Sequence, residues 1–218
     1  MIKTDEQHRG EIVDCARALH RLNFCPATSG NLSARLDAWR ILITPTAVPK
    51  TDMQSEDLVV VSPEGRRRFG RREPTSELGM HLQIYRLRPD IKAIVHAHPP
   101  IATAFACAGV ALDQPIASEF VMAVGQAPLA AYGTPGTPEL TASLERLIPR
   151  HTAILMGNHG VVTYGKDLKD AFGKMELVEH FADLVLATLK IGSQVKLTPE
   201  QLRRLEEAAA RYGTGRRP

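Results

Sequence analysis

Apolar residues recur three and four positions apart in several stretches of the chain, which is the spacing of one face of an α-helix. The clearest stretch follows a capping box made by Thr4 and Gln7. It predicts a helix from about Asp5 to Leu22. Pro74 opens another such stretch and Pro89 closes it. Further helices are predicted over residues 101–109, 138–147, 168–191 and 199–210.

Short runs of β-branched and aliphatic residues lie between these helices and predict strands. A polar turn, TSGN, leads into one strand, and Pro63-Glu64-Gly65 marks a hairpin turn between two others. Strands and helices mix without a regular βαβ alternation, which favours one mixed or antiparallel sheet covered by helices. We expect a single domain over residues 1–218. The predicted strands include residues 40–44, 58–62, 93–98, 152–156 and 160–164.

The composition is that of an ordinary globular protein with a sizeable core. Hydrophobic residues make up 44% of the 218 residues, charged residues make up 23%, and the formal net charge is +3. This small charge does not by itself indicate a nucleic-acid partner, and no run approaches the roughly 18 apolar residues that cross a membrane. The three cysteines are widely spaced without a CxxC pair, and the N-terminus lacks an apolar leader. We therefore expect a cytoplasmic protein that binds neither nucleic acid nor membranes.

Three histidines have the placement that a metal site requires. His96 and His98 are separated by one residue in a predicted strand, so both imidazoles point to one face and can reach the same ion. His159 lies between two apolar strands, in a turn where flanking glycines let the backbone approach closely. Three nitrogen ligands without a cysteine indicate a catalytic zinc site with an open position, and cobalt, manganese or iron would also suit imidazole. Taken singly, each histidine is better explained as an ordinary part of its sheet or turn, and it is their combination with a nearby glutamate that favours a metal site.

A carboxylate and two hydroxyl-rich segments add to this site. Glu77 follows Thr75 and Ser76 in the first turn of a predicted helix, where free amides and the helix dipole stabilise anions. Beside a metal such a carboxylate can act as ligand and general base, and the alternative is a capping glutamate without chemistry. The segments 28–31 and 44–46 combine hydroxyl groups with glycine or amide groups that can bind phosphate, or they are ordinary turns.

The motifs SGN, ITPT, PTSE, HAHPP and NHG occur in this order along the chain. Together they resemble the class II aldolase/adducin family over almost the whole sequence. The resemblance implies a three-layer α/β/α sandwich with a central, largely antiparallel sheet, commonly assembled into homotetramers with active sites between subunits. Members that act on L-fuculose 1-phosphate are zinc-dependent lyases. They cleave a ketose 1-phosphate reversibly to dihydroxyacetone phosphate and an aldehyde, through an enediolate bound to the metal.

The resemblance also implies a role for each matching residue. One Zn²⁺ ion per subunit would be held by His96, His98 and His159. Glu77 would occupy the fourth metal position at rest and would serve as acid and base once the substrate displaces it. The substrate phosphate would be bound by Thr28, Asn31, Thr46, Thr75 and Ser76.

Two positions depart from the family pattern. Ala47 follows ITPT where the aldolase has a glycine, and this change restricts φ in the predicted phosphate loop. Phe120 stands where the aldolase has a tyrosine, a proton donor to the aldehyde alkoxide. Tyr212 resembles a second aldolase tyrosine and could donate the proton instead, across a subunit interface.

Other functions fit parts of the sequence. In the superfamily, related sites perform 4-epimerisation of pentulose 5-phosphates, dehydration of a methylthioribulose phosphate and decarboxylation of a sugar-acid phosphate. Aldol cleavage is favoured over these three, and an epimerase would need a further acid/base pair. An adducin-like interaction module without catalysis would not need the three histidines or Glu77. Five arginines within residues 66–72 could bind nucleic acid, although a solvated hairpin is favoured.

Overall fold

One mixed sheet of eight strands forms the centre of the part of the molecule that the computed structural model describes, residues 3–212. Neighbouring strands are antiparallel except for the last pair, which is parallel. The order across the sheet is β4 (Arg67–Phe69), β3 (Val59–Val61), β2 (Ile41–Ile43), β1 (Asn31–Arg35), β5 (Ala93–Ala97), β8 (Gly160–Gly165), β7 (Ala153–Met156) and β6 (Leu129–Ala130).

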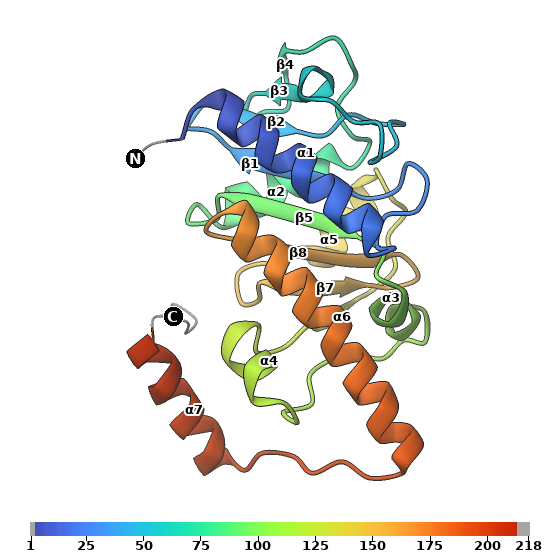
Figure 1. Ribbon diagram of the computed structural model, residues 1–218, viewed down its shortest axis with the longest axis vertical. Helices are drawn as coiled ribbons and strands as arrows, with labels where there is room; N and C mark the ends of the chain where they lie inside the picture. The colour runs from blue at the N-terminus through green and yellow to red at the C-terminus, as the bar shows by residue number, and fades with distance from the viewer. Residues whose placement is uncertain (1–2, 213–218) are drawn as a thin grey trace.

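Helices cover both faces of this sheet. One layer contains α1 (Asp5–Arg21), α3 (Pro100–Cys107), α4 (Ser118–Ala123) and α6 (Leu168–Ile191), and the other contains α2 (Leu78–Leu87) and α5 (Pro138–Leu144). In Figure 1, α1 and α6 cross the front of the sheet, and α2 and α5 lie behind it. The short helix η1 (Ser55–Asp57) precedes β3, and α7 (Pro199–Tyr212) contacts α4 away from the sheet. No helix within residues 3–212 combines the length and apolar character that a membrane span requires.

The sandwich confirms the predicted fold class, and alternation along the central strands explains its two cores. Leu32 on β1 and Val95 on β5 are fully buried against the α1 and α6 layer. Ile94 is fully buried against the α2 and α5 layer. Asn31 and His96 lie on that same second face, so two polar side chains enter the sheet beneath α2.

The predicted elements agree with the structure apart from small shifts at their ends. The helix predicted over residues 168–191 matches α6, whereas the one predicted over 138–147 ends as an α-helix at Leu144. The strand predicted over 93–98 ends at Ala97, because two prolines follow and Pro100 begins α3. His98 therefore lies just beyond the strand rather than inside it.

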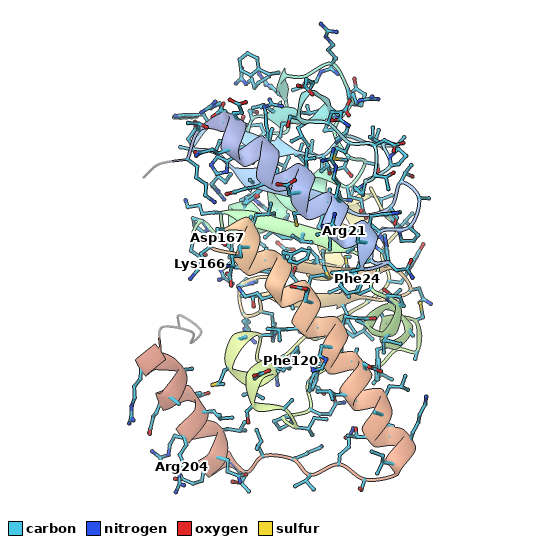
Figure 2. All side chains as sticks on the ribbon, viewed as in Figure 1. Arg21, Phe24, Phe120, Lys166, Asp167 and Arg204 are labelled. Carbon is cyan, nitrogen blue, oxygen red and sulfur yellow. The ribbon has the colours of Figure 1, made fainter. Side chains whose placement is uncertain are left out.

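The helix α4 has no counterpart among the predicted elements. Six residues are too few to display a helical period, and so short a helix depends on tertiary contacts. Phe120 supplies such a contact, because its ring stacks on Phe181 of α6 with 3.9 Å between centroids and 6° between planes. Figure 2 shows Phe120 between α4 and α6, on the α6 face of the molecule.

Two alanines adopt a backbone conformation that normally favours glycine. Ala27 has a φ of 51° and Ala47 has a φ of 57°. The Cβ atom of an L-residue makes this region unfavourable by roughly 1–2 kcal/mol. Ala47 stands where the aldolase has a glycine. It adopts the conformation that favours glycine, and its backbone is therefore strained.

Replacing Ala47 with glycine is expected to raise the free energy of unfolding by about 0.5–1 kcal/mol, because relief of this strain exceeds the added entropy of the unfolded chain. Urea denaturation measures the change. Ala38→Gly is the matched control, since Ala38 is an exposed loop residue outside the positive-φ region. It should lower stability slightly. An equal loss in both variants would contradict the strain at Ala47.

Candidate metal centre

Three imidazoles converge at one end of the central strands. His96, His98 and His159 offer one nitrogen each, and these nitrogens all lie within 4.8 Å of one another. The ring centroid of His96 is 4.7 Å from each of the other two, which are 5.3 Å apart. His96 is fully buried and the other two are partly buried, so the cluster faces outward from the core.

Local backbone features bring these three rings together. His96 lies on β5, while the backbone amide of His98 donates to the carbonyl of Phe24 at 2.8 Å just past the strand. His159 lies in the tight turn between β7 and β8. Gly160 is required there, because a Cβ atom at this position would stand 2.6 Å from Cδ2 of His98. The NHG motif thus makes room for the second ligand while it presents the third.

Glu77 faces this cluster from the start of α2. Its Oε2 atom is 3.1 Å from Nε2 of His96, and its Oε1 atom is 3.3 Å from Nε2 of His159. The Asn31 amide donates to the same Oε2 at 2.7 Å. Glu77 is the N-cap residue of α2, and its side chain is buried. It therefore lies one position before the first helical turn, in which the sequence predicted it.

Charges in this site shift the pKa values strongly. Burial would raise the pKa of Glu77, but His96, His159 and the Asn31 hydrogen bond outweigh burial and hold that pKa well below its usual range. Burial and the two neighbouring imidazoles lower the pKa of His98 to about 3, and burial and His96 lower that of His159 to about 4. Both rings are therefore neutral near pH 7, which is the protonation state that ligates metals.

The donor set fits a divalent cation. Nδ1 of His96 lies 2.9 Å from the Val161 carbonyl oxygen, which can only accept, so Nδ1 carries a proton. Burial would lower the pKa of His96, but Glu77 and this hydrogen bond raise it, and a cation would replace the proton on Nε2 and accept its lone pair. Nε2 of His96 and Oε1 of Glu77 are buried without a hydrogen-bond partner among the described residues. Lone pairs from three imidazoles and a carboxylate converge here, and a cation between them would remove their mutual repulsion.

Four of the predicted phosphate-binding residues lie on three loops, and Asn31 begins β1. Pro45 and Pro74 form an isolated antiparallel bridge, so the loop of Thr46 runs beside the loop of Thr75 and Ser76. Thr46 and Ser76 are exposed, whereas Thr75 is buried and its hydroxyl accepts from the Glu77 amide at 3.3 Å. Thr28 is exposed, and Asn31 is buried beside Glu77. Thr75 and Asn31 both form hydrogen bonds with Glu77, so the predicted phosphate-binding residues lie next to the candidate metal site.

Two buried residues near the site were not predicted. Lys50 is fully buried, and its Nζ donates to the Thr28 carbonyl at 3.1 Å. Burial lowers the pKa of Lys50, and none of the described carboxylates forms an ion pair with it. His81 on α2 is also fully buried, and its Nε2 lies 2.5 Å from Oδ1 of Asn31. A sequence signal for His81 exists, since it stands four residues after Glu77 and so shares its helix face.

Phe120 and Tyr212 are the two positions that the sequence analysis connects with proton transfer to the aldehyde oxygen. Phe120 is buried in the α4 and α6 contact, so its ring is a core group. Tyr212 is the last residue of α7, and its side chain lies outside the described part of the structure. In Figure 1 the end of α7 lies on the opposite side of the molecule from α3, which follows His96 and His98 along the chain.

Comparison with known proteins assigns this chain to one family. The family model of the Class II Aldolase and Adducin N-terminal domain matches residues 10–186, and the chain belongs to this family. A 3-oxo-tetronate 4-phosphate decarboxylase of Pectobacterium atrosepticum is 35% identical over 84% of this chain and 86% of its own. A 5-methylthioribulose-1-phosphate/5-deoxyribulose-1-phosphate aldolase of Rhodospirillum rubrum is 33% identical over 94% and 92%. A solved L-fuculose 1-phosphate aldolase superimposes with a TM-score of 0.88 at 29% identity, covering 97% of this chain and 98% of that one.

Replacing His98 with alanine is expected to remove most of the bound metal, because two imidazoles and one carboxylate bind a divalent ion far more weakly than the full set. Elemental analysis of protein purified with added zinc measures the content per chain. His180→Ala is the control, because His180 is an exposed residue on α6 outside the cluster. Equal zinc in the two variants would remove His98 from the ligand set.

Proposed function

We propose that this protein is a metal-dependent aldolase, a lyase that cleaves a ketose 1-phosphate reversibly to dihydroxyacetone phosphate and an aldehyde. The observation that carries the proposal is the buried Glu77 carboxylate, held 3.1 Å and 3.3 Å from the nitrogens of His96 and His159. A structural helix cap would not need to face two imidazoles. Aldolases among the relatives support the same reaction class.

His96, His98 and His159 would hold one ion per subunit, with Glu77 as the fourth ligand at rest, and zinc is the proposed metal. When bound, the ion would polarise the ketose carbonyl and stabilise the negative charge that carbon–carbon cleavage leaves on the substrate. Glu77 would carry the proton to and from the carbon that loses the aldehyde, because it is the carboxylate that faces the ligand nitrogens.

The substrate phosphate would be bound beside the metal by hydroxyl and amide groups. Thr46 and Ser76 are exposed on adjacent loops, and the Nδ2 group of Asn31 has a second proton besides the one that it gives to Glu77. Lys50 adds a buried positive charge directly behind Thr28. A dianionic phosphate over these loops would compensate a lysine that has no described carboxylate partner.

Replacing Glu77 with glutamine should leave the zinc content unchanged and lower kcat by a factor of about 100 or more, because the variant keeps three imidazoles and loses its general base. Steady-state kinetics together with metal analysis separates the two effects. Glu56→Gln removes an exposed carboxylate on η1 and should behave as the unchanged protein. Full turnover in Glu77→Gln would exclude Glu77 as the proton carrier.

We also propose that the active protein is a homo-oligomer, with a tetramer favoured. The end of α7 lies far from the α3 side of its own chain, so Tyr212 would serve the aldehyde oxygen of a neighbouring subunit. Apolar groups at the end of α6 and in the segment after it support an association surface, since Leu189, Ile191 and Val195 are 58%, 76% and 89% exposed.

Decarboxylation of a sugar-acid phosphate is the second candidate, and Phe120 is the observation that favours it. Cleavage to an aldehyde moves a proton on the hydroxyl oxygen next to the broken bond, whereas loss of carbon dioxide requires no such transfer. A buried phenyl ring cannot carry that proton. Decarboxylation of a 3-oxo-tetronate 4-phosphate and cleavage of a ketose 1-phosphate both leave the enediolate of dihydroxyacetone phosphate, so Glu77 and the phosphate loops would serve both reactions.

A substrate panel tests these two reactions against each other. The zinc-loaded protein is expected to release dihydroxyacetone phosphate from ketose 1-phosphates such as L-fuculose or 5-deoxyribulose 1-phosphate, at rates well above those with 3-oxo-tetronate 4-phosphate. A coupled reductase assay measures the common product, and carbon dioxide release identifies decarboxylation. Faster turnover of 3-oxo-tetronate 4-phosphate than of the ketose 1-phosphates would overturn the aldolase proposal and support decarboxylation. Conversion of substrate without dihydroxyacetone phosphate would exclude both.

A further inference from the structure

A continuous line of buried polar side chains leads from Glu77 into the core between β1 and α2. Nδ2 of Asn31 donates to Oε2 of Glu77 at 2.7 Å, and Oδ1 of Asn31 lies 2.5 Å from Nε2 of His81. On the other side of that ring, Nδ1 lies 2.7 Å from the Ser33 hydroxyl, which lies 2.9 Å from the Tyr85 hydroxyl. The exposed fraction of each of these five residues is 8% or less.

The two elements place these residues in matching rows. Asn31 and Ser33 are two positions apart on β1, so their side chains share one face of the sheet. Glu77, His81 and Tyr85 are four positions apart at the start of and along α2, so they share one face of the helix. The remaining side chains of this layer form the apolar core of α2 and α5, which isolates the polar line from water.

The chemistry of the groups determines the direction of every hydrogen bond in this line. A carboxylate accepts only, so the Asn31 amide nitrogen faces Glu77 and its oxygen faces His81. Nε2 of His81 must therefore donate. Burial and the nearby His96 lower the pKa of His81 to about 3, so the ring is neutral near pH 7 and Nδ1 accepts. The Ser33 hydroxyl then donates to Nδ1 and accepts from Tyr85, whose pKa burial raises.

We propose that His81 is a positioning residue, which fixes the Asn31 amide so that its nitrogen, and never its oxygen, faces the Glu77 carboxylate. His81 adds a second constraint to that of Glu77, because a turned-over amide would place its oxygen against Oε2 of Glu77 and its NH2 group against the Nε2 proton of His81. Ser33 and Tyr85 are compatible with the His81 tautomer that has its proton on Nε2, because the Ser33 hydroxyl can donate to Nδ1 while it accepts from Tyr85. The function of this arrangement rests on the proposed proton transfer by Glu77.

Neutron diffraction from deuterated crystals of the full protein tests the orientation directly and needs no activity. Deuterium is expected on Nε2 of His81 and not on Nδ1, with the Asn31 amide nitrogen toward Glu77. Deuterium on Nδ1, or the Asn31 oxygen toward Glu77, would overturn the proposal. Failure of the aldolase proposal would leave this measurement unaffected, so the two failures are distinguishable.

A pair of variants tests the effect on turnover. His81→Phe keeps a ring and removes both nitrogens, and we expect kcat to fall about 10- to 100-fold with little change in KM or zinc content. His81→Gln offers one donor and one acceptor in the same direction and should recover most of that loss. Equal loss in both variants would indicate a packing role alone, and an unchanged kcat in folded His81→Phe would overturn the proposal. If His81→Phe does not fold, the neutron result decides the proposal.

Discussion

The antiparallel pairing of β1 with β5 is the constraint on which the rest of this site depends. It sets Asn31 directly opposite His96, on the sheet face that α2 covers. Leu32 and Val95 occupy the opposite face and are completely buried. A shift of one residue would turn the polar side chains into the α1 and α6 core and the apolar ones toward α2. Hydrophobic burial therefore fixes the register that positions the candidate metal ligands.

The same geometry explains why so much polarity can be buried beneath α2. An isolated carboxylate or lysine in a core is strongly unfavourable, so each buried polar group needs a partner or a neutral form. Glu77 has Asn31 and the imidazoles, and His81 is neutral with both nitrogens hydrogen-bonded. Two of the buried atoms that have no hydrogen-bond partner among the described residues, Nε2 of His96 and Oε1 of Glu77, lie where the histidines converge. Asn31 and His81 are thus hydrogen-bonded on one side of Glu77, and its unpaired oxygen lies where a cation fits.

Much of this arrangement was predictable from the sequence, because its signals are local. The alternation of β5 predicted that His96 and His98 act together, and glycine next to His159 predicted a tight turn. The line through His81 was not predicted, since it depends on which strand packs beneath α2, and no local pattern contains that information. Lys50 was missed for the same reason: its burial follows from loop packing over Thr28, which a single lysine in a polar segment does not reveal.

Features that agree with the family and features that depart from it lie in different parts of the molecule. Residues that would handle the phosphate and the enediolate come from β1, β5, the β7–β8 turn and the start of α2, and there the backbone even keeps a glycine-like φ at Ala47. Groups that handle the aldehyde or the carbon dioxide would come from α4 and the end of α7. On α4, the Phe120 ring stacks on Phe181. The half-reaction that an aldolase and a decarboxylase share therefore has a complete set of candidate groups within one chain. Under the proposed function, the choice between aldehyde and carbon dioxide would depend on α4, α7 and a neighbouring subunit. Motifs on the sheet would then identify the family more sharply than the substrate.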